Sequence, residues 1–118
     1  MVSFSLSGKR ALVTGSNIGI GRAIAIALGA AEAEVICASR SGAADTVAQI
    51  AHARELRLDF ADPMAARDVF AAEPIDILVN NAGIIRRGAS EDFAEADWDD
   101  VIDVNLKAAF FTCQAYAR

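Results

Sequence analysis

The chain has 118 residues, which suits one domain and is too short for two. Hydrophobic residues make up 54% of it, so we expect a packed core and not a disordered chain. The formal net charge of −5 argues against a surface for nucleic acid or for an anionic membrane. No apolar run approaches the roughly 20 residues that span a bilayer, and the amino terminus has no signal-peptide core, so we predict a cytoplasmic protein.

Short apolar runs alternate with helical patterns along the chain. The apolar runs predict strands at residues 9–14, 34–38, 54–58 and 75–79. The helical patterns predict helices at residues 20–31, 43–53, 62–72 and 97–118. Asp62 and Pro63 are typical of a helix start, and Pro74 prevents that helix from continuing. In the last helix the apolar residues recur at three- and four-residue spacings and line one face: Trp98, Val101, Ile102, Leu106, Ala109, Phe110 and Cys113.

Strands separated by helices imply right-handed crossovers and a parallel sheet. We predict an α/β fold of the Rossmann type over residues 1–118, a doubly wound parallel sheet with strand order 3-2-1-4. In this arrangement the ligand crevice opens where the strand order reverses, between the first and fourth strands. Two unusual turns, Thr14–Gly21 and Asn80–Gly83, follow those two strands, so they are expected to flank one crevice.

The first of these turns has the sequence expected of a phosphate-binding loop. A short apolar strand precedes Thr14–Gly21, and a helix begins at its end. Glycines let the backbone turn sharply and let a ligand come close, while the free N–H groups of the helix start face the phosphates. The alternative, an ordinary strand–helix turn, is disfavoured once the second turn is counted.

These residues resemble a known family. Thr14–Gly21 matches the TGxxxGIG motif of the short-chain dehydrogenases/reductases, and Asn80–Gly83 matches their NNAG motif. Asp59 and Asn105 fall where that family has an aspartate and an asparagine, and the resemblance covers nearly the whole chain. A closer likeness, over residues 80–87 and 97–107, is to the 2-deoxy-D-gluconate 3-dehydrogenase subgroup, whose substrates are sugar acids.

The resemblance implies a role for each motif residue. The dinucleotide turn is implied for Gly15, Ser16, Asn17, Gly19, Ile20 and Gly21. Asp59 would accept a hydrogen bond from the adenine amino group; the alternative is a solvated turn residue or a local cap. The backbone of Asn81, Ala82 and Gly83 would run past the adenosine ribose, while Asn80 would tie neighbouring strands together. Asn105 would be the catalytic residue of this set, because its backbone carbonyl would hold a water molecule in the proton relay.

The choice between NAD and NADP stays open, so we predict NAD(P). NAD enzymes commonly have a carboxylate after the second strand, but this chain has Arg40, a group suited to the 2′-phosphate of NADP. The alternative is a surface arginine, and the resembled subgroup is mostly NAD-linked. Arg86 and Arg87 follow the fourth strand; one of them would bind the carboxylate of a sugar acid, or both lie in a solvated loop.

The remaining predictions concern structure and completeness. Cys37 and Cys113 are expected to be buried small hydrophobes, and no metal-ligand spacing is found. The family usually has glycine where this chain has Glu32, so we expect a strained left-handed backbone there.

The family's catalytic serine and its Tyr-x-x-x-Lys pair are absent, because Tyr116 is the only tyrosine and Arg118 ends the sequence. We expect the amino-terminal half of a homo-oligomeric enzyme, truncated before the fifth strand, which leaves the fourth strand as a free edge. The alternative is a complete, non-catalytic dinucleotide-binding or interaction module.

Overall fold

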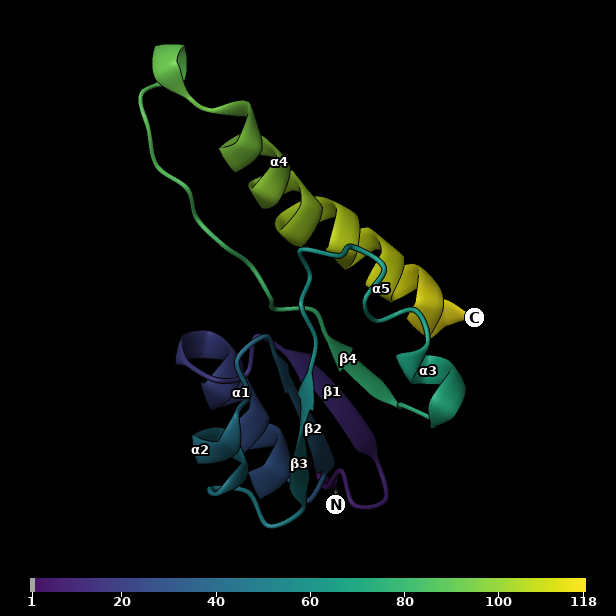
Figure 1. Ribbon diagram of the computed structural model, residues 1–118. Coiled ribbons are helices and arrows are strands. Elements are labelled where there is room, and N and C mark those ends of the chain that lie inside the picture. Colours follow the sequence, from purple (N-terminus) through teal and green to yellow (C-terminus); the bar gives the residue numbers. More distant parts are fainter. Residues whose placement is uncertain (1) are drawn as a thin grey trace.

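Four short strands form one parallel sheet. The computed structural model describes residues 2–118 and is drawn in Figure 1. The strands are β1 (Arg10–Thr14), β2 (Glu34–Ser39), β3 (Ala53–Arg57) and β4 (Ile77–Val79). Their order is β3-β2-β1-β4 and every neighbouring pair is parallel, which confirms the predicted doubly wound sheet.

Helices cover both faces of this sheet, because the two central strands, β1 and β2, are apolar on both sides. On one face, Val13 and Val35 are fully buried and pack against α1 (Gly19–Ala30) and α2 (Ala44–Val47). On the other face, Leu12 and Ile36 are fully buried beside partly buried residues that include those of α3 (Val69–Ala72). Alternate residues of β1 and β2 therefore belong to two separate cores.

Two predicted helices are much shorter than expected. The helix predicted at residues 43–53 is limited to α2, after which the chain turns and enters β3. Ile50 lies so close to Gly29 of α1 that a side chain on that glycine would overlap it, so packing against α1 overrides local helix preference. The helix predicted at residues 62–72 is limited to α3. The Asp62 carboxylate accepts the Met64 N–H at 2.9 Å, which stabilises a turn instead of a helix start.

The turn after α1 has the geometry expected of a glycine. Glu32 has a φ of 79°, and it is the single non-glycine residue with positive φ between residues 2 and 118. The strained left-handed backbone predicted for this position is confirmed, at a cost on the order of 1–2 kcal/mol.

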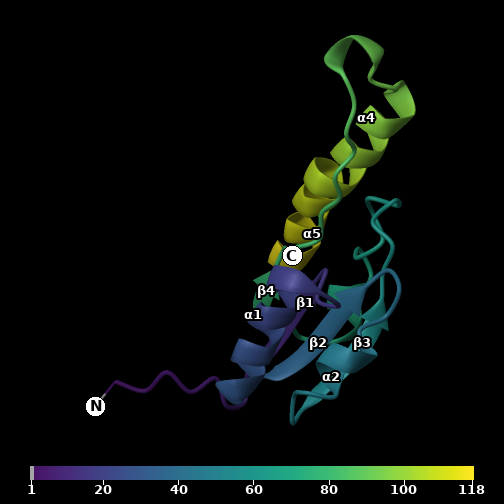
Figure 2. The same cartoon turned by 90° about the vertical axis from the view of Figure 1, so that its left-hand side faces the viewer.

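The carboxyl-terminal segment forms a helical arm, which we define as residues 95–117. It consists of α4 (Glu95–Ile102), a π-helical turn η2 (Asp103–Lys107) and α5 (Ala108–Ala117), preceded by the 3₁₀ turn η1 (Ser90–Asp92). Figures 1 and 2 show it as one rod that extends well beyond the sheet, and the molecule measures 56 × 29 × 28 Å. The π-helical turn was not predicted, because it has no distinct residue pattern.

The apolar residues predicted to line one face of the arm are mostly exposed. Trp98, Leu106 and Phe110 are each about 60% exposed. The arm instead packs on the sheet body through Val104 and Ala108, which join Phe60 in a small cluster. No helix within residues 2–118 is long and apolar enough to cross a bilayer.

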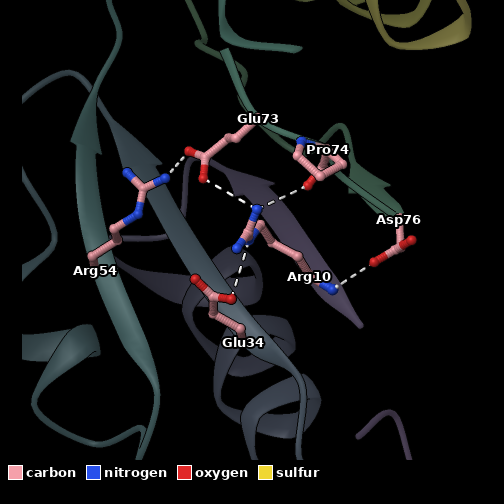
Figure 3. A network of polar contacts seen from close by, with 6 residues as sticks. All are labelled: Arg10, Glu34, Arg54, Glu73, Pro74 and Asp76. Carbon is pink, nitrogen blue, oxygen red and sulfur yellow. Dashed lines mark hydrogen bonds and ion pairs between the residues drawn. The ribbon is translucent and has the colours of Figure 1, made fainter. Parts of the chain in front are cut away.

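Charged residues hold the amino-terminal edge of the sheet together, as Figure 3 shows. The Arg10 guanidinium lies 3.1 Å from the Glu34 carboxylate and 3.3 Å from that of Glu73, which also pairs with Arg54. The backbone N–H of Arg10 donates to the Asp76 carboxylate at 2.9 Å. These contacts link β1, β2 and β3 to the turn before β4, and so fix the position of β4 beside β1.

Candidate functional site

The two turns predicted to flank the crevice are joined through Thr14. Its buried hydroxyl oxygen accepts the backbone N–H groups of Asn81 and Ala82 at 2.9 Å each, and the hydroxyl lies 3.4 Å from the Val79 carbonyl. The Asn81 side chain donates to the Gly15 carbonyl at 3.2 Å. Sequence reasoning did not select Thr14 as a site residue. The sequence feature that could have indicated Thr14 is a hydroxyl residue at the end of a buried strand, where backbone N–H groups of a neighbouring turn need a hydrogen-bond acceptor.

Two glycines of the first turn have no room for a side chain. Gly15 has a φ of 63°, and a Cβ on it would lie 3.0 Å from the Cα of Ala82. A Cβ on Gly21 would overlap both the Gly15 carbonyl oxygen and the Asn81 amide nitrogen. Both glycines are therefore needed for the close approach of α1 to the two turns.

Gly19 has the opposite surroundings. Its φ is 59°, and a Cβ on it would meet nothing within 4 Å, so the backbone faces open space. No side chain caps the start of α1, and Ile18 and Ile20 on either side are exposed. An uncapped helix start beside an open glycine fits the phosphates of a dinucleotide, because the free N–H groups attract negative charge.

Ser16 lies in the same turn, but its side chain faces the protein. The Ser16 hydroxyl donates to the Ala38 carbonyl at 3.2 Å, and the Ser16 carbonyl accepts the Thr46 hydroxyl at 2.8 Å. Burial raises the pKa of the neighbouring Cys37 thiol, while its hydrogen bond with Ser16 acts in the opposite direction. Cys37 is thus the buried small residue that was predicted.

The residues predicted for the adenosine end lie at the carboxyl ends of β2 and β3. Arg40 is exposed directly after β2, and within residues 2–118 no carboxylate forms an ion pair with it. Asp59 is exposed, and its carboxylate accepts the Ala61 N–H at 2.9 Å. That bond is the local cap considered as an alternative, and it leaves the second carboxylate oxygen without a hydrogen bond to any other group of residues 2–118.

Asn105 lies in the π-helical turn and holds the segment that follows β4. Its side-chain oxygen accepts the Ile84 N–H at 2.8 Å, and its side-chain nitrogen donates to the Ile84 carbonyl at 2.9 Å. A Cβ on Gly83 would lie 3.3 Å from the same side-chain oxygen. The Ala108 N–H bonds to the Asp103 carbonyl five residues back, so the α-helical ladder is interrupted around Asn105.

The predictions for Asn80 and Cys113 are corrected together. The Asn80 side chain donates to the Ala109 carbonyl at 2.9 Å and to the Cys113 sulfur at 3.3 Å. Asn80 therefore ties β4 to α5, whereas the neighbouring Asn81 joins the two strand ends. Cys113 is exposed and not buried.

Arg86 and Arg87, predicted to face a substrate carboxylate, have different surroundings. The Arg86 guanidinium lies 3.7 Å from the Asp97 carboxylate and 3.8 Å from that of Asp100, both on α4. Arg87 is exposed, and no carboxylate of residues 2–118 forms an ion pair with it. A groove of about 370 Å³ lies between the Arg86 segment and α4. In the described part of the chain, no three His, Cys, Asp or Glu side chains are grouped to hold a metal ion.

Comparison with known proteins identifies the origin of this geometry. Residues 9–118 match the family model described as short chain dehydrogenase. The chain belongs to this family. The geometry described above is therefore that of a chain in the short-chain dehydrogenase family: two turns joined by hydrogen bonds, Gly19 facing open space, and Asn105 bonded to Ile84.

Three relatives illustrate the match. The chain is 42% identical to a 2-dehydro-3-deoxy-D-gluconate 5-dehydrogenase of Bacillus subtilis and 44% identical to a gluconate 5-dehydrogenase of Gluconobacter oxydans. Each alignment covers 98% of this chain and 49% of the relative. A crystal structure from Agrobacterium tumefaciens, a candidate 2-deoxy-D-gluconate 3-dehydrogenase with bound NADP, is 57% identical with a TM-score of 0.95. That match covers 99% of this chain and 49% of the other. The chain thus spans about half the length of these relatives.

Proposed function

We propose that this chain forms the cofactor-binding half of an NAD(P)-dependent dehydrogenase of sugar acids. The observation that carries the proposal is the junction of the two turns through Thr14, beside the open backbone at Gly19. An arrangement of this kind holds a pyrophosphate at a helix start and leaves the adjoining groove between two strands for the two nucleosides. The family membership and the NADP bound to the Agrobacterium relative support the same cofactor.

The residues of the site divide the cofactor between them. The pyrophosphate would lie on the turn from Gly15 to Gly21, with Asn17 and Ile20 lining it and Ser16 holding the turn from behind. The adenine would be bound near Asp59, and the adenosine ribose near Arg40 and the backbone from Asn81 to Gly83. The bound nicotinamide ring supplies hydride exchange with an alcohol carbon of the substrate.

Asn105 is the one residue of this chain proposed for the catalytic machinery. We infer that the π-helical turn leaves a backbone carbonyl there without its usual helical N–H partner, and the Asn105 side chain fixes the turn against Ile84. A freed carbonyl is a hydrogen-bond acceptor suited to hold a water molecule for proton transfer. The one tyrosine, Tyr116, is not a candidate acid or base, because its hydroxyl donates to the Asp76 carbonyl at 2.5 Å.

The sugar-acid substrate is proposed from the names of the relatives and from the basic pair after β4. Arg87 forms no ion pair within residues 2–118 and has its guanidinium available for a carboxylate, whereas Arg86 is engaged by two carboxylates of α4. The exposed apolar residues Trp98, Leu106 and Phe110 support a homo-oligomer of the full enzyme, since exposed apolar patches are typical of subunit contacts.

The test is direct binding of NADH and NADPH to the 118-residue protein, measured by nicotinamide fluorescence and calorimetry. We expect saturable binding of at least one of them. Gly19→Ala keeps the fold with modest strain but places a methyl group in the open space, so binding should weaken at least tenfold.

Gly88→Ala is the matched control, because its methyl group would make an ordinary contact of 3.4 Å with Phe93, and binding should not change. Folded protein that binds neither dinucleotide would contradict the proposal. Binding without any effect of Gly19→Ala would place the cofactor elsewhere. The alternative is a non-catalytic dinucleotide-binding module. If that alternative holds, the protein binds the dinucleotide but shows no hydride transfer, even after the other half of the fold is added.

A further inference from the structure

Arg57 ends β3 beside the carboxyl end of β2. Arg57 and Ser39 are partners in the parallel register, and the Leu58 N–H donates to the Ser39 carbonyl at 3.1 Å. Partners in register on neighbouring parallel strands face the same side of the sheet. Arg57 and Ser39 therefore share the face that α2 covers, at the edge where the turn from Ser39 to Ala43 begins.

The Arg57 guanidinium reaches this turn. Gly42 has a φ of 92°, and a Cβ on it would lie 3.0 Å from a terminal nitrogen of Arg57. A Glu55 carboxylate oxygen lies equally close to that position, but it accepts the Ala43 N–H at 2.8 Å. Within residues 2–118 no ion pair involves Arg57, so its charge is not fully compensated by the protein.

A buried hydroxyl at the same place has no partner. Ser39 is 6% exposed, and no protein atom of the described chain forms a hydrogen bond with its Oγ. Buried hydroxyls in proteins are almost always paired, so an unpaired one at a ligand-facing edge calls for an explanation. Arg40 follows Ser39 directly, is exposed, and forms no ion pair within residues 2–118.

We propose that Arg57 acts with Arg40 to bind the phosphate monoester on the adenosine ribose of NADP, and so sets the preference for NADP over NAD. The inference rests on the proposed function, because it assumes a dinucleotide in the crevice. A phosphate monoester carries about −1.5 to −2 charges at pH 7, which a single arginine cannot neutralise. Arg40 and Arg57 lie at two neighbouring strand ends, and the carboxylates of Glu55 and Asp59 on the same segment accept the N–H groups of Ala43 and Ala61.

The experiment compares the dissociation constants of NADPH and NADH for the wild type, Arg57→Gln, Arg40→Gln and Arg54→Gln. Arg57→Gln should raise the dissociation constant of NADPH about tenfold, as expected for the loss of one charge-assisted contact, and should change that of NADH less than twofold. Arg54→Gln is the charge-matched control, since Arg54 lies on β3 but faces the opposite side of the sheet and pairs with Glu73. It should leave the ratio of the two constants unchanged.

Three results would overturn the inference in distinguishable ways. Equal weakening of NADPH and NADH in Arg57→Gln would show a structural role only. No weakening of NADPH, in a wild type that binds both dinucleotides, would show that Glu55 compensates Arg57, and the proposed function would still stand. A folded wild type that binds neither dinucleotide would overturn both proposals together.

Discussion

The sheet body and the helical arm are built on opposite principles. In the body, Leu12, Val13 and Ile36 are fully buried between helices or turns on both faces of the sheet. In the arm, Leu106 is 62% exposed and Phe110 59% exposed. The body is stabilised by its own apolar core, whereas the arm contacts the rest of the protein through a few side chains.

Side-chain hydrogen bonds fix the arm to the sheet body at three places. Asn80 binds α5, Asn105 binds Ile84, and Tyr116 binds the Asp76 carbonyl. These contacts join the arm to residues on both sides of β4, since Asp76 precedes the strand and Asn80 and Ile84 follow it. The arm therefore takes its position from β4 and the turns at its two ends.

The largest expected difference comes from one substitution made in both regions. Leu12→Ala removes a fully buried side chain and should lower the free energy of unfolding by about 3 kcal/mol, because it leaves a cavity. Leu106→Ala removes the same atoms from an exposed position and should change that free energy by less than about 0.5 kcal/mol. Urea unfolding followed by circular dichroism measures both values. Similar losses for the two variants would mean that the arm surface is covered in solution.

The next effect strengthens the body. Glu32→Gly relieves the left-handed backbone and should raise the free energy of unfolding by about 1 kcal/mol, and the melting temperature by roughly 4–8 °C. Glu32→Ala is the control, since it loses the same hydrogen bond with Ser5 but keeps the strain, so it should give no gain. A lower melting temperature for Glu32→Gly would show that the carboxylate matters more than the backbone geometry.

A third expected effect, of similar size, is confined to the arm. Asn105→Ala removes both hydrogen bonds to Ile84 and should cost about 1 kcal/mol, because the contact is partly exposed to water. Hydrogen exchange should accelerate for residues 84–107 and remain unchanged for β1 and β2. Faster exchange throughout the sheet would show that the arm and the body unfold as one unit.

The sheet could be predicted because its signals are local. The runs at β1 and β2 are apolar and short, and glycine-rich turns follow β1 and β4, so strand order and crevice followed from general rules. The two short helices were overestimated because Ile50 and Asp62 make contacts that outweigh helix preference. Tertiary contacts of this kind have no signature in a window of a few residues.

The candidate site shows the same division. The glycines were selected correctly for the geometry of the turn, since Gly15 and Gly21 lie where no side chain fits. Thr14 was overlooked because its partners come from the other turn, 67 and 68 residues later in the chain. The ion pairs of Arg86 with Asp97 and Asp100 could not be predicted, because those carboxylates come from a helix further along the chain.

The π-helical turn alters which faces of the arm the residues on its two sides occupy. Each residue advances an α-helix by about 100°, so one extra residue in a turn rotates everything beyond it by about that angle. The angle about the helix axis between Trp98, before the turn, and Phe110, after it, therefore differs from the angle in an unbroken α-helix. A single-residue deletion within residues 103–107 would remove the extra residue and restore regular winding, with the side chains of α4 and α5 on the faces that they have now. The same deletion within α4 or α5 would rotate the residues beyond it by about 100° and should be the more disruptive change.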